Sequence, residues 1–157
     1  MSRRTRLLSV LLCAFVMLWT TKAAYAQCKS GSNCQIILSG TALPATPNPP
    51  CTPWGLWVWS QPSNNSYGND GDGSLYFYAI HKAEAHVEAR NVTLSGSSIS
   101  ETVSGAYPDG TAVSCTLAAH QTSPGKGILD SMSCTVGTNS CSATDIPITV
   151  DISDAKN

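Results

Sequence analysis

From residue 35 onward, apolar and polar residues alternate along the chain with a period of two. Such alternation is typical of β-strands that bury one face. In residues 27–157, no stretch of a dozen residues has the stripe of apolar residues that marks an amphipathic helix. The alternation predicts strands over residues 35–39, 55–60, 75–82, 85–94, 98–104, 111–119, 128–136 and 145–153. Turn sequences separate them, among them Tyr107-Pro108-Asp109-Gly110 and Ser123-Pro124-Gly125.

Seven or eight short strands in a chain of this length are the number found in a two-sheet sandwich. We therefore predict an all-β, antiparallel β-sandwich, with a small β-barrel as the alternative. Pro147 lies in the last predicted strand and favours an edge position, because proline has no N–H to donate.

The first 26 residues have the three parts of a secretory signal peptide. Arginines precede an apolar run, Leu7–Leu18, and Ala24-Tyr25-Ala26 is a cleavage sequence. The apolar run is shorter than the roughly 20 residues that span a membrane. We expect a single exported β domain over residues 27–157, periplasmic or extracellular, with no membrane span after cleavage. Residues 27–50 are rich in proline and are expected to form a loosely packed arm tied by disulfides.

The mature domain would be mildly acidic. Five of the nine basic residues and all ten acidic residues remain after cleavage, for a formal charge of −5. A domain without a basic stripe is a poor candidate for binding nucleic acid.

Six cysteines remain after cleavage, and an even number in an exported chain indicates a disulfide framework. None of them is spaced as the paired C-x-x-C of a zinc site. Cys115 and Cys134 lie in the apolar phase of strands that are joined by one turn or face each other across the sandwich, and either arrangement could bring them within reach of a disulfide. Fifteen pairings of the six cysteines are possible, and the set we prefer is Cys115–Cys134, Cys28–Cys34 and Cys51–Cys141.

Aromatic residues mark two neighbouring predicted strands. Trp57 and Trp59 share one face of the first, and Tyr76 and Tyr78 share one face of the second. If these strands pair, the four rings form one patch, which would suit a glycan or a partner protein. The alternative is that the rings are one side of the core, since tryptophan is highly buried on average.

Other residues suggest weaker chemistry. Asp70 and Asp72, on a glycine-rich turn, offer oxygen ligands for calcium, although the EF-hand spacing fails and a plain turn explains them as well. His81 or His86 with a carboxylate would be the base of a small hydrolase, although no G-x-S-x-G motif is present.

We therefore expect an exported, non-catalytic domain without a cofactor, which binds a glycan or an extracellular protein through its aromatic face. A small secreted hydrolase is one alternative. Another is a protease inhibitor that presents the proline-rich loop Thr41–Pro50, braced by a disulfide.

Overall fold

The computed structural model describes residues 34–42, 54–62, 71–78, 80 and 82–154. These residues form eight strands and no helix, as the alternation predicted. The strands are β1 Cys34–Ala42, β2 Trp54–Ser60, β3 Gly71–Phe77, β4 Ala85–Ser95, β5 Ser98–Ala106, β6 Ala112–Ser123, β7 Lys126–Val136 and β8 Asn139–Asp154.

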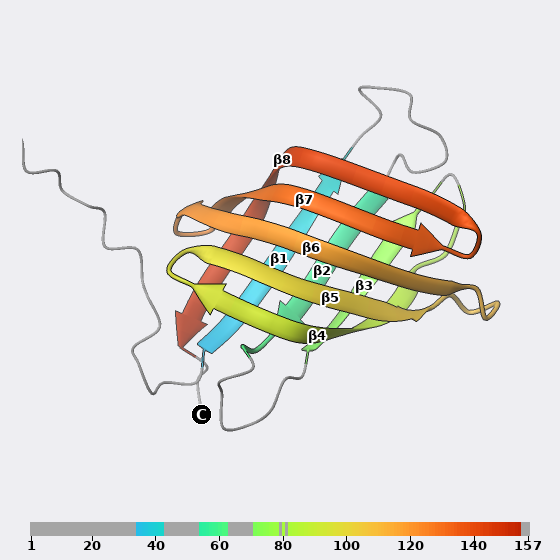
Figure 1. The fold of residues 1–157 in the computed structure, drawn as a ribbon, viewed down its shortest axis with the longest axis horizontal. Coiled ribbons are helices and arrows are strands. Elements are labelled where there is room, and N and C mark those ends of the chain that lie inside the picture. The colour runs from blue at the N-terminus through green and yellow to red at the C-terminus, as the bar shows by residue number, and fades with distance from the viewer. Residues whose placement is uncertain (1–33, 43–53, 63–70, 79, 81, 155–157) are drawn as a thin grey trace, which may run out of the picture.

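The eight strands form one closed antiparallel barrel, in which each strand pairs with the next and β8 returns to β1 (Figure 1). The predicted two-sheet sandwich is wrong, and the alternative of a small barrel is correct. Strand β8 closes the sheet because it has two partners in succession. Its residues Asn139–Ile148 pair with β7, and Thr149–Asp154 pair with β1.

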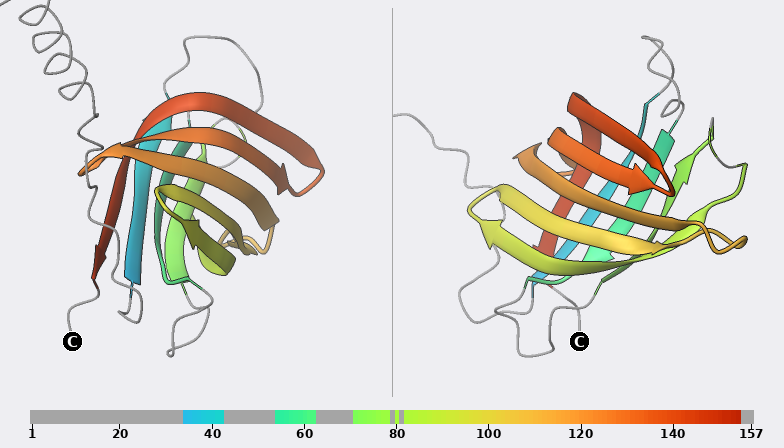
Figure 2. Two further views of the ribbon diagram at one scale, coloured as in Figure 1. Left: turned by 60° about the vertical axis from the view of Figure 1, so that its left-hand side comes forward. Right: turned by 45° about the vertical axis from the view of Figure 1, so that its right-hand side comes forward.

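The barrel is flattened into two layers, so its strands alternate between buried and exposed residues as the strands of a sandwich do. β1 to β3 and the end of β8 lie behind a second layer of strands, and the two layers cross at an angle (Figures 1 and 2). Glycines on the inner face allow the sheet to bend this tightly. A Cβ on Gly73 would lie 2.3 Å from the carbonyl oxygen of Trp57, and a Cβ on Gly105 would lie 1.8 Å from that of His86.

Side chains from every strand fill the barrel interior, as expected for eight strands. In β2, Trp54, Leu56 and Val58 point inward and are at most 4% exposed. The residues between them point outward, so the two faces of this strand have different partners. The apolar side chains with no exposed surface are Ile36, Leu38, Val58, Leu75, Phe77, Ala85, Val87, Val92, Val103, Leu117, Leu129, Val136 and Val150.

A disulfide joins Cys115 and Cys134 inside the barrel, as predicted. The two residues face each other directly on β6 and β7, with their Cα atoms 4.0 Å apart. Cys34 and Cys141 each take part in a disulfide as well. Cys28 and Cys51 lie outside the described residues, so the count of three disulfides stays a prediction.

Two segments expected to be irregular are strands. Residues 71–74, which precede the predicted strand over residues 75–82, begin β3, and residues 139–144, which precede the predicted strand over residues 145–153, begin β8. Pro147 does lie where β8 has one partner, because pairing with β1 starts at Thr149. The described part of the predicted arm, Cys34–Ala42, is β1. Within the described residues, no helix is long and apolar enough to span a membrane.

Candidate ligand-binding surface

The four predicted aromatic residues lie outside the core. Trp57 is 47% exposed and Tyr78 is 52% exposed, whereas Trp59 and Tyr76 are half-buried. The tryptophan that belongs to the core is Trp54, at 2% exposure. β2 and β3 are neighbours, as the patch requires. Trp57, Trp59 and Tyr76 therefore share the outer face of one sheet, and Tyr78 follows the end of β3.

The ring of Tyr76 lies over Gly55, its direct neighbour on β2. A Cβ on Gly55 would stand 2.0 Å from Cε1 of Tyr76 and 2.7 Å from its hydroxyl oxygen. Only a residue without a side chain leaves room for the ring there. The absence of a side chain at Gly55 therefore lets the ring of Tyr76 lie close to the backbone of β2, and Tyr76 and Trp57 line the same hollow.

A hollow of about 310 Å³ lies between these two aromatic rings and β1. Apart from the rings, its wall is polar, because hydroxyl groups and one carboxylate project from four different segments. The lining residues are Ser39, Gly40, Thr41, Gly55, Leu56, Trp57, Ser74, Tyr76, Glu84 and Thr149. The register explains this composition, since Ser39 faces Trp57 on one side and Thr149 on the other.

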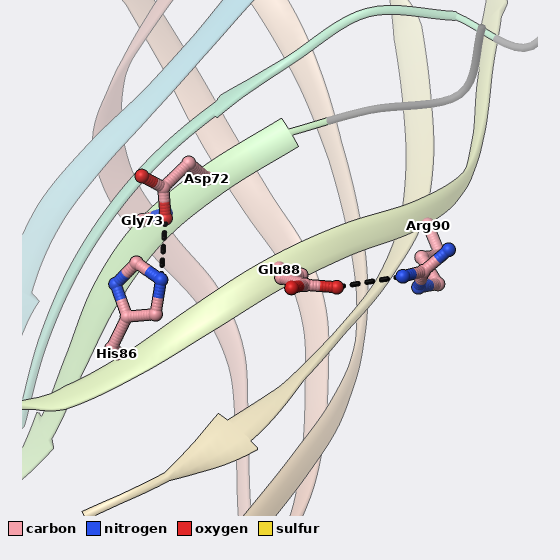
Figure 3. Close-up of polar contacts among 5 residues, drawn as sticks. All are labelled: Asp72, Gly73, His86, Glu88 and Arg90. Carbon is pink, nitrogen blue, oxygen red and sulfur yellow. Dashed lines mark hydrogen bonds and ion pairs between the residues drawn. The ribbon is translucent and has the colours of Figure 1, made fainter.

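Charged side chains continue the same outer face onto β4 (Figure 3). His86 Nε2 lies 3.3 Å from Asp72 Oδ1, and that oxygen also accepts a hydrogen bond from the backbone N–H of Gly73 at 2.8 Å. Arg90 and Glu88 form an ion pair of 2.7 Å. Both pairs are more than half exposed, so water screens them and they add little stability.

Two predicted sites fall partly outside the described residues. Asp70 is not described, whereas Asp72 faces His86. Among the described residues no three metal-ligating side chains converge. His81 is likewise not described, and His86 has the carboxylate partner that the hydrolase hypothesis requires. Residues 43–50 of the proposed inhibitor loop are not described either.

A second histidine–carboxylate pair, which the sequence did not suggest, lies on β6 and β7. His120 Nδ1 is 2.8 Å from Asp130 Oδ1. A β-bulge brings them together, because the register between the two strands shifts between Ala118 and Ala119. Bulges re-aim side chains in this way and leave no mark in the alternation of the sequence.

The barrel interior holds a carboxyl group that the sequence analysis also missed. Glu101 is 1% exposed, and neither of its carboxyl oxygens has a hydrogen-bond partner among the described residues. Burial raises the pKa of Glu101. The nearby Ser60 hydroxyl lowers that pKa, but its position falls short of hydrogen-bond geometry. The sequence did carry a signal, since Glu101 shares the inward phase of Ile99 and Val103.

Replacing this carboxyl should stabilise the domain at neutral pH. Because the folded state raises the pKa of Glu101, folding favours its protonated form. The contribution of Glu101 to the free energy of unfolding is therefore greatest when the pH is below 4.5, the ordinary pKa of a glutamate, and it is lost as the pH rises through the pKa of the folded state. We expect Glu101→Gln to be about 1–3 kcal/mol more stable than the wild type at pH 7, and the gain to shrink towards pH 4.

Urea unfolding of both proteins across this pH range measures the difference. Loss of stability in Glu101→Gln at pH 7 would show that the carboxylate has a compensating partner.

The outer face of β1–β3 thus combines exposed aromatic rings, a polar hollow and adjoining charged groups, while the interior is filled by side chains. No family of known proteins, no curated protein and no solved structure matches this chain.

Proposed function

We propose that this protein is an exported, non-catalytic module that binds glycans on the outer face of β1–β3. The observation that carries the proposal is the position of Trp57, a half-exposed indole on the wall of a polar hollow. A sugar ring has an apolar face, which stacks on an aromatic ring, and an edge of hydroxyl groups. Ser39, Thr41 and Thr149 offer hydrogen-bonding groups beside that ring.

A glycan fits this surface better than a protein partner does. The buried centre of a protein–protein interface is depleted of charged residues and enriched in apolar and aromatic ones. Here Trp57 and Tyr78 are the large apolar side chains most exposed among the described residues, and hydroxyl groups and charges surround them. An aromatic residue with polar neighbours is suited to a ligand that is itself amphipathic.

Binding rather than hydrolysis is favoured on this face because His86, the candidate base on it that has a carboxylate partner, is largely exposed to water. Catalytic acids and bases depend on burial and charged neighbours to tune them. The side chains of His86 and Asp72 are 73% and 61% exposed. Their pairing is explained as a polar contact across two strands on an open face.

A glycan array followed by calorimetry tests the proposal. We expect the purified domain to select a set of oligosaccharides, and Trp57→Ala to weaken the tightest of them at least tenfold. Stacking of a nucleic-acid base on an aromatic side chain is worth about 1–3 kcal/mol, and we expect a similar loss when a sugar ring can no longer stack on Trp57. Gly55→Ala should also weaken binding, because the new Cβ would displace the ring of Tyr76.

Thr116→Ala, on the outer face of β6, is the matched control and should bind as the wild type does. A domain that selects no glycan, or that binds equally well without Trp57, would contradict the proposal.

A further inference from the structure

A second hollow, of about 440 Å³, adjoins the first. It lies where β8 leaves β7 and joins β1, and it shares Ser39, Gly40, Thr41 and Thr149 with the hollow beside Trp57. The two hollows therefore adjoin each other along β1 and β8, and we call them together the trough. It runs from β3 over β1 and β8 to the start of β7.

The length of the trough indicates a ligand of more than one sugar ring. Each hollow alone has a volume in the range that accommodates one small ligand. A single ring stacked on Trp57 would leave the second hollow empty. A chain of rings that crosses Ser39 and Thr149 would occupy both.

The two ends of the trough differ in charge. Glu84 lines the aromatic end, and Lys126 lines the far end at the start of β7. The other residues that line the far end are uncharged, among them Thr122, Ile128 and Pro147. An anionic group on the ligand would therefore be attracted to the far end and repelled from the aromatic end.

We infer that the trough binds an acidic oligosaccharide, with an uncharged ring on Trp57 and a carboxylate of a following ring at Lys126. This inference rests on the proposed function and specifies its ligand class. Suitable probes are oligosaccharides in which glucuronic acid alternates with N-acetylglucosamine, because an uncharged ring can then stack on Trp57 while an acidic ring further along the chain reaches Lys126. The methyl ester of the same tetrasaccharide is the uncharged counterpart.

Calorimetry of the whole exported domain with the disaccharide, the tetrasaccharide and the methyl-esterified tetrasaccharide tests the inference. We expect the tetrasaccharide to bind at least tenfold more tightly than the disaccharide. Lys126→Gln should weaken the acidic tetrasaccharide about two- to fivefold, as befits an exposed ion pair, and should not affect its methyl ester. Added salt should reduce the same difference.

Arg90→Gln is the matched control, since it removes one positive charge from a residue that lines neither hollow. Equal affinity for the two chain lengths, or equal loss in Arg90→Gln and Lys126→Gln, would overturn the inference. If Trp57→Ala still abolishes binding in that case, the glycan-binding proposal stands and only the acidic ligand fails. If Trp57→Ala binds normally, the glycan-binding proposal itself fails.

Discussion

Trp54→Ala is expected to destabilise the domain by about 3–5 kcal/mol, whereas Trp57→Ala, three residues further along the same strand, should cost less than about 1 kcal/mol. Trp54 is 2% exposed and points into the barrel, so its loss leaves a cavity that the closed sheet cannot fill. Trp57 points outward and is 47% exposed, so its loss opens no cavity in the core.

Urea unfolding of the two variants measures both values, and each variant serves as the control for the other. The expected result is a large shift in midpoint for Trp54→Ala alone, with an unchanged dependence on denaturant. Similar losses in both variants would mean that Trp57 is a core residue, which would remove the basis for the binding surface.

The second large effect concerns the disulfide between β6 and β7. Replacing Cys115 and Cys134 together by alanine should cost about 3 kcal/mol, within the range of 2–5 kcal/mol for a native disulfide in a small exported domain. The bond closes a loop with a sequence separation of 19, and it lies in the core, so its loss frees the unfolded chain and leaves unfilled space.

Denaturant unfolding of the double variant gives this cost. The control is Thr116→Ala with Ser133→Ala, the next pair across the same two strands, whose side chains are exposed. The control should stay within about 0.5 kcal/mol of the wild type. A loss below 1 kcal/mol in the cysteine variant would show that the pairing of β6 and β7 does not depend on the bond.

Much of the strand content could be predicted from the sequence, because alternation reports which residues face inward. The pairing of Cys115 with Cys134 followed from their shared phase on two strands joined by one turn. Closure of the sheet could not be predicted in this way. A sandwich and a barrel have the same alternation, and the difference lies in β8, which continues through Pro147 to reach β1.

The binding surface was predictable only in part. The outward phase of Trp57 and Trp59 is visible in the sequence, but the same phase would face a second sheet in a sandwich. The trough depends on the register that sets Ser39 beside Thr149, two residues far apart in the chain. Likewise, the contact of His120 with Asp130 depends on a β-bulge, which the alternation of apolar and polar residues does not indicate.

The central claim is that a glycan stacks on the outer face beside Trp57, and the indole N–H resonances of the tryptophans test it most directly. In a ¹⁵N-labelled protein that comprises residues 27–157 these signals come from Trp54, Trp57 and Trp59, and they can be assigned by substitution. On titration with the tightest glycan from the array, the account predicts that the Trp57 signal shifts most and that the Trp54 signal stays in place. A shift centred on Trp54, or none at any of the three, would contradict it.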